Sequence, residues 1–71
     1  MEQELKNNIK KFRFMSDQIT QDELANKLGV SRQTILAIEG GKFNPSVKLA
    51  LKIAQYFNCK IEDIFYLEEI K

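Results

Sequence analysis

The sequence has no histidine or tryptophan, and it contains one cysteine, one proline and three glycines. Because Cys59 is the only cysteine, an intrachain disulfide is excluded, and without histidine the usual nitrogen and sulfur ligands of zinc are missing. A catalytic cysteine–histidine pair is excluded as well, together with acid–base chemistry built on histidine. We therefore expect a protein that has no metal, no cofactor and no catalytic activity.

Long apolar segments are also missing, since no run approaches the roughly 20 residues that a membrane-spanning helix needs. The start of the chain, Met1-Glu2-Gln3-Glu4, lacks the basic and then apolar character of a signal peptide. We therefore expect a cytoplasmic protein without membrane contact. The 71 residues, 44% hydrophobic and 30% charged, have the composition of a globular chain, and residues 1–71 are predicted to form a single domain.

The formal net charge of +1 does not itself indicate a nucleic-acid partner, so the distribution of charge matters more. Residues 27–48 contain four basic residues and one acidic residue, a balance of +3 (4 − 1). Residues 60–71 contain two basic and four acidic residues, a balance of −2 (2 − 4). Positive charge thus gathers in the middle of the chain.

The spacing of apolar residues predicts an all-α fold of five helices, over about residues 5–14, 21–28, 32–39, 47–57 and 61–66. The first prediction rests on Leu5, Ile9 and Phe12, which are spaced to form one helical stripe. That helix would carry basic residues on its outer face, namely Lys6, Lys10, Lys11 and Arg13. Along the fourth helix, Val47 is expected to belong to the buried face.

The stretch from Thr20 to Glu39 is the most informative part of the sequence. Thr20 and Glu23 have capping-box spacing at the start of one helix, and Gly29 is suited to the left-handed residue that ends it. Ser31 can cap the following helix. Apolar residues then point inward, at Leu24, Ala25, Leu28, Val30, Ile35 and Ile38. The outward residues of the second helix are Arg32, Gln33, Leu36 and Ala37.

This pair of helices resembles the helix-turn-helix domains of the phage repressor/Cro type, the Xre family. The resemblance covers roughly residues 5–67 and includes Ile9, Phe12 and Arg13, the exit Glu39-Gly40-Gly41-Lys42, the corner Asn44-Pro45-Ser46, and the ending Ile61-Glu62-Asp63-Ile64-Phe65. The chain departs from the family pattern in two places. Asp17-Gln18 stands where many relatives have glycine, and Lys60 stands where a capping serine or threonine is common.

The resemblance implies that the helix over 32–39 enters the major groove of double-stranded DNA. Arg32, Gln33, Leu36 and Ala37 would then face the bases. Gln33 could bind adenine, and Arg32 could bind guanine or, instead, a phosphate. Leu36 could contact a thymine methyl group or simply be an exposed apolar residue.

The resemblance also implies contacts with the DNA backbone, made by Gln21, Thr34, Lys42, Asn44 and Lys48. Gln21 lies at a helix N-terminus, where amide groups attract phosphate, and its side chain could also brace Arg32. It could equally be a tolerated first helical residue without a role. Glu39 is expected to cap or pair within the protein rather than contact DNA.

We expect a homodimeric repressor, because one domain of this size contacts only half of a typical operator. Compact relatives usually dimerise through the fourth and fifth helices, so the interface candidates are Leu51, Tyr56, Phe65, Tyr66 and Leu67. The alternative is that Phe65 and Leu67 fold back on the first helix, where the tail over 66–71 could pair with residues 2–6 as a short strand. An alternative function is an antitoxin-like module that acts mainly through protein contacts.

Overall fold

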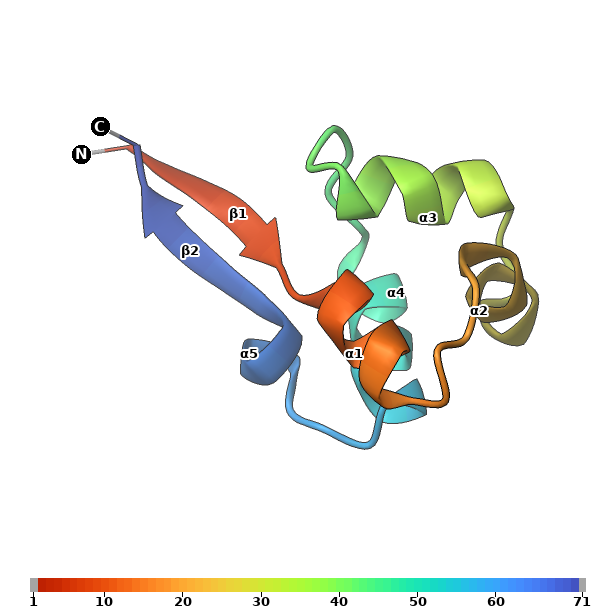
Figure 1. The fold of residues 1–71 in the computed structure, drawn as a ribbon. Coiled ribbons are helices and arrows are strands. Elements are labelled where there is room, and N and C mark those ends of the chain that lie inside the picture. Colours follow the sequence, from red (N-terminus) through yellow and green to blue (C-terminus); the bar gives the residue numbers. More distant parts are fainter. Residues whose placement is uncertain (1, 71) are drawn as a thin grey trace.

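Five short helices and two strands make up the structure, a computed structural model that describes residues 2–70. Lys71, the last residue of the predicted tail, lies outside the described part. The helices form the body, and the two strands form a ribbon that leaves it on one side (Figure 1). In chain order the elements are β1 (Gln3–Asn7), α1 (Ile9–Met15), α2 (Gln21–Leu28), α3 (Arg32–Glu39), α4 (Val47–Tyr56), α5 (Ile61–Ile64) and β2 (Phe65–Glu69).

The helices α2, α3 and α4 each begin at a residue whose side chain caps the helix. Thr20 Oγ1 accepts the Glu23 N–H at 3.0 Å, and Glu23 Oε1 accepts the Thr20 N–H at 2.9 Å, which completes the predicted capping box. Ser31 and Ser46 cap α3 and α4 through their hydroxyl groups. The predicted helices over 21–28 and 32–39 are therefore confirmed with these boundaries.

Left-handed backbone conformations occur in the connections before and after α2, at a glycine, as the sequence predicts, and at residues other than glycine, where it does not. Gly29 ends α2 with a φ of 73°, and its neighbour Val30 donates its N–H to Ala25 at 3.0 Å. Before α2, Asp17 and Gln18 have φ values of 58° and 55°. These two residues thus adopt a left-handed conformation that is more usual for glycine.

One hydrophobic core joins the helices to the base of the ribbon. The buried apolar residues come from every helix and from β2, namely Ile9, Leu24, Ala25, Leu28, Ile35, Ile38, Ala50, Ile53, Ala54, Ile64 and Phe65. Val47 was predicted to be buried but is 74% exposed. It is the first residue of α4, one turn before Ala50, which is the first buried residue of that helix.

The first and last helices are shorter than predicted, because residues 5–7 and 65–66 belong to strands. Leu5, where the first helix was predicted to begin, lies within β1 (Gln3–Asn7), and α1 begins only at Ile9. Asn7 Oδ1 accepts the Ile9 N–H at 3.2 Å, a contact that starts α1 after the two asparagines and separates it from β1. Likewise α5 ends at Ile64, and the chain continues as β2.

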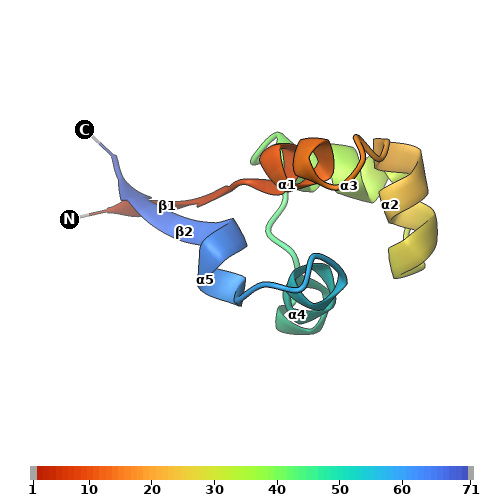
Figure 2. The same cartoon turned by 60° about the horizontal axis from the view of Figure 1, so that its bottom comes forward.

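The two strands pair antiparallel, which confirms the alternative that the tail forms a strand with the N-terminal residues. In the register of the ribbon, Leu5 faces Leu67 and Asn7 faces Phe65. Two hydrogen bonds bracket the pairing: Asn8 N–H to Ile64 O at 2.8 Å, and Ile70 N–H to Glu2 O at 3.2 Å. The ribbon makes the molecule elongated, with extents of 36 × 22 × 21 Å, and Figure 2 shows it extending away from α2.

Candidate nucleic-acid interface

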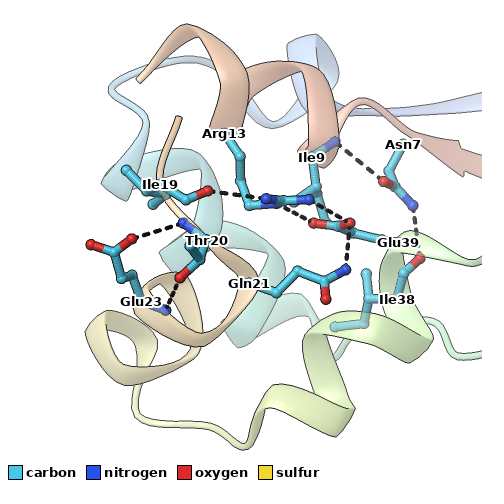
Figure 3. A network of polar contacts seen from close by, with 9 residues as sticks. All are labelled: Asn7, Ile9, Arg13, Ile19, Thr20, Gln21, Glu23, Ile38 and Glu39. Atoms are coloured by element: carbon cyan, nitrogen blue, oxygen red, sulfur yellow. Dashed lines mark hydrogen bonds and ion pairs between the residues drawn. The ribbon is translucent and has the colours of Figure 1, made fainter. Parts of the chain in front are cut away.

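A bidentate ion pair between Arg13 and Glu39 lies where α1, α2 and α3 meet (Figure 3). Arg13 Nε donates to Glu39 Oε2 at 2.7 Å and Arg13 Nη2 donates to Oε1 at 3.1 Å. The remaining Arg13 nitrogen, Nη1, donates to Ile19 O at 3.0 Å. Gln21 Nε2 adds a third donor to Glu39, at 3.0 Å from Oε1. The carboxylate thus ties three helices together.

This ion pair is largely shielded from water, since the two side chains are only 14% and 9% exposed. Charge-assisted bidentate hydrogen bonds fix both distance and direction, so the pair holds α3 at one angle to α1. Glu39 pairs within the protein, as expected. Arg13 does not lie on an outer face as predicted, because it follows the buried Ile9 by four residues and therefore shares the inner face of α1, from which it reaches Glu39.

Gln21 points its amide at Glu39 rather than at Arg32, so the predicted brace to Arg32 is not what the structure shows. The carboxylate accepts one amide N–H of Gln21, and this fixes the side chain across the start of α2. Gln21 and Arg32 nevertheless border the same hollow, of about 590 Å³, beside the α1–α2 connection. Asp22, an acidic residue, also lines this hollow.

The exposed face of α3 brings together three of the four predicted base-contact residues. Arg32, Gln33 and Leu36 are exposed and border one shallow depression of about 100 Å³. Ala37 is half-buried, so only part of its surface reaches this face. The opposite side of α3 is held in the core by Ile35 and Ile38. An amide, a guanidinium and an apolar side chain therefore stand side by side on a rigid helix.

The predicted backbone contacts are spread around this face. Lys42 and Asn44 are exposed on the loop that follows the C-terminal end of α3, and Lys48 is exposed in the first turn of α4. Thr34 is half-buried, and its Oγ1 lies 3.0 Å from Ser31 Oγ. Thr34 thus lies in the first turn of α3, whereas Lys42 and Asn44 follow the C-terminal end of this helix.

The sequence that forms α2 and α3 also lies within a match to a protein family. The family profile described as Helix-turn-helix matches residues 15–64. The chain belongs to this helix-turn-helix family. The membership confirms the predicted resemblance to the Xre type and the expectation that the chain is not an enzyme, because the family is a class of DNA-binding regulators.

Similar proteins extend over most of this helix-turn-helix chain. It is 58% identical over 65 residues to an uncharacterised HTH-type transcriptional regulator of Methanocaldococcus jannaschii, covering 92% of this chain and 97% of the relative. A regulator of the same description from Bacillus subtilis is 46% identical over 92% of this chain and 97% of its own length. A crystal structure of a candidate DNA-binding protein from Bacteroides fragilis matches with a TM-score of 0.75 at 27% identity, covering 87% of this chain and 98% of that one.

Two further contacts support the helix-turn-helix pair and were not predicted. Lys52 Nζ donates to Leu28 O at 3.2 Å, so α4 places a cation at the C-terminal end of α2, where the helix dipole is negative. Asn7 Nδ2 donates to Ile38 O at 2.9 Å and joins β1 to α3. Neither contact has a local signal in the sequence, since its partners lie far apart along the chain.

The predicted dimer residues occupy two separate elements. Leu51 and Tyr56 are exposed on α4, whereas Tyr66 and Leu67 are exposed on β2. Phe65 was grouped with them, but it is only 9% exposed and belongs to the core. Its side chain therefore leaves little surface for a partner.

The remaining polar and sulfur chemistry is structural. Among residues 2–70, no group of three or more His, Cys, Asp or Glu side chains is placed to hold a metal ion. Cys59 Sγ donates to Ala54 O at 3.7 Å, and burial raises the pKa of the Cys59 thiol. It packs against the core as a small apolar residue, as expected.

No helix within residues 2–70 is long and apolar enough to cross a membrane.

Proposed function

We propose that this helix-turn-helix protein binds specific sites on double-stranded DNA as a homodimer, with α3 in the major groove, and represses transcription in the cytoplasm. The observation that carries the proposal is the exposed face of α3, where Arg32, Gln33 and Leu36 border one depression. A helix fits the major groove, and its exposed side chains then lie against base edges.

Each of these side chains suits a different base edge. The Gln33 amide can donate to adenine N7 and accept from adenine N6, and the Arg32 guanidinium can donate twice to guanine. Leu36, 48% exposed, can cover a thymine methyl group, with Ala37 beside it. A good bidentate pair discriminates between bases by about 1–3 kcal/mol, so Arg32 and Gln33 carry most of the proposed specificity.

The backbone contacts fix the position of α3 along the groove. Gln21 uses one amide hydrogen for Glu39, which leaves the second for a phosphate beside the N-terminus of α2. Lys42, Asn44 and Lys48 are exposed and supply donors beyond the other end of α3, and Thr34 completes the set. Such contacts orient the protein but carry no direct sequence information.

Repression is the proposed sign of regulation because it requires only that the protein occupies a site. The names of the relatives from Methanocaldococcus jannaschii and Bacillus subtilis describe transcriptional regulators, which supports a regulatory role without giving its sign. A reporter placed behind the bound site would show lower expression when the chain is present. Higher expression would reverse the proposed sign.

The test of DNA docking compares a base-contact variant with a backbone-contact variant. Gln33→Ala should weaken binding to the selected site by about 1–3 kcal/mol and relax the preference at one base pair. Lys42→Ala should weaken binding to all sequences and lower the salt slope by about one. Fluorescence anisotropy over a salt series measures both, on sites selected from a random duplex pool.

The matched control is Lys11→Ala, which removes one positive charge from the exposed surface of α1. It should leave both the base preference and the salt slope nearly unchanged. If Gln33→Ala and Lys42→Ala also leave binding to the selected site unchanged, α3 is not the surface that docks on DNA.

A second candidate function is a partner-binding module of the antitoxin kind, which acts through protein contacts. It is favoured by exposed apolar residues outside α3, on the loop that follows it and on α4, namely Phe43, Val47 and Leu51, which are 51%, 74% and 53% exposed. Leu51→Glu would then abolish regulation while leaving DNA affinity intact. The DNA-binding proposal expects regulation to follow DNA affinity instead.

A further inference from the structure

The outer edge of β1 has unpaired backbone groups. In an antiparallel pair, residues alternate between those bonded to the partner strand and those whose peptide groups point away. The bonds between Asn8 and Ile64 and between Ile70 and Glu2 place the even-numbered residues of β1 toward β2. The N–H and C=O groups of Gln3, Leu5 and Asn7 therefore point outward.

These outward groups have no partner within residues 2–70. No backbone hydrogen bond found outside the helices and the ribbon involves the peptide groups of Gln3, Leu5 or Asn7. An exposed edge of this kind is a template for a further strand, and a ribbon of two strands is only marginally stable by itself. Figures 1 and 2 both show the ribbon running away from the helices, with its far end beside no helix.

We propose that β1 pairs with β1 of a second copy of this chain, with the two-fold axis at Leu5. The inference rests on the proposed homodimer and names its interface. The Leu5 N–H of each copy donates to the Leu5 C=O of the other, and the four strands form one antiparallel sheet in the order β2, β1, β1, β2. Gln3 of one copy then pairs with Asn7 of the other.

The charges of β1 select this register. With the axis at Leu5, Glu4 of each copy lies opposite Lys6 of the other, and the two pairs are equivalent by symmetry. With the axis at Glu4 the two Glu4 carboxylates face each other, and with the axis at Lys6 the two ammonium groups do. With the axis at Gln3, Glu4 faces Glu2. The Glu4 register also places Glu2 opposite Lys6, but it sets the two Glu4 carboxylates against each other. The Leu5 register pairs opposite charges without placing like charges directly opposite each other, which would be destabilising.

The side-chain spacing strengthens this selection. Glu4 and Lys6 direct their peptide groups toward β2, so across the new edge they form a non-hydrogen-bonded pair, the type in which side chains come closest. Within one copy, Glu4 faces Glu68 across the ribbon, and Lys6 Nζ reaches Glu4 Oε1 at 3.0 Å. A second Lys6 on the open side of Glu4 offsets the repulsion between the two carboxylates.

The outer edge of β2 is less suited to the same pairing. Its charged residues are Glu68 and Glu69, with no cation between Phe65 and Glu69 to oppose them in a second copy. Moreover, α5 ends directly before Phe65, so a strand paired along β2 would soon meet this helix. The complementary edge is therefore that of β1.

Charge reversal on two separate chains tests the pairing. Lys6→Glu and Glu4→Lys each turn both intermolecular pairs into repulsive ones, and each alone should raise the dimer dissociation constant at least about tenfold. In an equal mixture, one copy presents two carboxylates at positions 4 and 6 and the other presents two ammonium groups. The mixture should therefore form a heterodimer with near wild-type affinity. Sedimentation velocity without DNA measures all three samples.

The mixing experiment distinguishes the interface between two chains from effects within one chain. Each variant also loses the contact between residues 4 and 6 of its own strand, and a second chain cannot restore that contact. Lys11→Glu, the same charge change on α1, should leave dimerisation unchanged. Gln3→Pro tests the pairing without a change of charge, because proline removes an outward N–H and leaves the bonds to β2 in place. It should weaken the dimer, while thermal unfolding shows that each variant is folded.

The pairing is overturned if the mixture dimerises no better than the single variants, or if wild-type chains stay monomeric both alone and on the selected duplex. Loss of the dimer in Leu51→Glu with no effect of the charge changes assigns the interface to α4 instead. Either result leaves DNA docking to be judged by Gln33→Ala. Conversely, a dimer that responds to charge as described but does not bind DNA contradicts only the proposed function.

Discussion

Glu39 is the residue on which the geometry of the DNA-binding helices most depends. Its carboxylate accepts two hydrogen bonds from Arg13 and one from Gln21, and its side chain is 9% exposed. Glu39→Ala should lower the free energy of unfolding by about 2–4 kcal/mol, because a shielded guanidinium loses its partner. Urea denaturation measures this loss. Glu62→Ala, on the exposed surface of α5, should change stability by less than about 0.5 kcal/mol.

A double-mutant cycle separates the ion pair from the packing of the individual side chains. In Arg13→Met with Glu39→Ala, the combined loss should be smaller than the sum of the two single losses, because neither charge is then left unpaired. Additive losses would mean that the contact between Arg13 and Glu39 contributes nothing beyond the packing of each side chain.

Glu23 links the α2 cap to pH. The Thr20 backbone N–H, and then the Thr20 side chain, hold the pKa of Glu23 below its ordinary value. A carboxylate with a depressed folded-state pKa contributes stability above its unfolded value of about 4.3, and this contribution is lost as pH falls through the folded value. Glu23→Gln keeps an oxygen acceptor but cannot ionise.

The wild type should therefore be more stable than Glu23→Gln at neutral pH, and the difference should shrink as the pH falls below the ordinary range of a glutamate. Urea denaturation at a series of pH values measures this difference. If it stays constant from neutral pH into the acid range, ionisation of Glu23 does not support the cap.

At the scale of elements, the turn between α2 and α3 depends on the backbone of Gly29. A Cβ added there would have no neighbour within 4 Å, so Gly29→Ala should be limited by its φ of 73° alone. The expected loss of stability is about 1–2 kcal/mol, the energy of the left-handed region for a residue with a side chain. Gly29→Asn should lose less, since asparagine tolerates this region better. Equal losses in the two variants would point to a steric cause.

The elements that the sequence predicts correctly are those whose signals are local. Thr20, Ser31 and Ser46 lie next to the helices that they cap, and Gly29 lies at the end of the helix that it terminates. The exposed face of α3 follows in the same way, because Ile35 and Ile38 alone determine which side is buried.

The features that the sequence does not predict depend on distant partners. Leu5 fits a helical stripe with Ile9, yet it forms a strand because Leu67 lies beside it in the fold. In the same way, Arg13 looks like a solvated charge until α3 brings Glu39 to it. Apolar and charge spacing cannot show which of several compatible partners a residue meets.

At the scale of the whole molecule, pairing through β1 would make stability depend on protein concentration. A native dimer that unfolds to monomers has a Tm that rises with concentration. The wild type should show this rise in thermal scans over a hundredfold range of concentration, and Lys6→Glu should show less of it. The same slope in both proteins would contradict a dimer held through this edge.

The ribbon also has a consequence for the order in which the chain folds. Its strands are paired across 58 positions of the sequence, from Asn7 to Phe65 (65 − 7), whereas α2 and α3 are separated by a short turn. Contacts between distant residues form late because a large loop must close first. During synthesis β1 therefore remains without its strand partner until β2 has left the ribosome, and the DNA-binding helices can form before the surface that we assign to dimerisation exists.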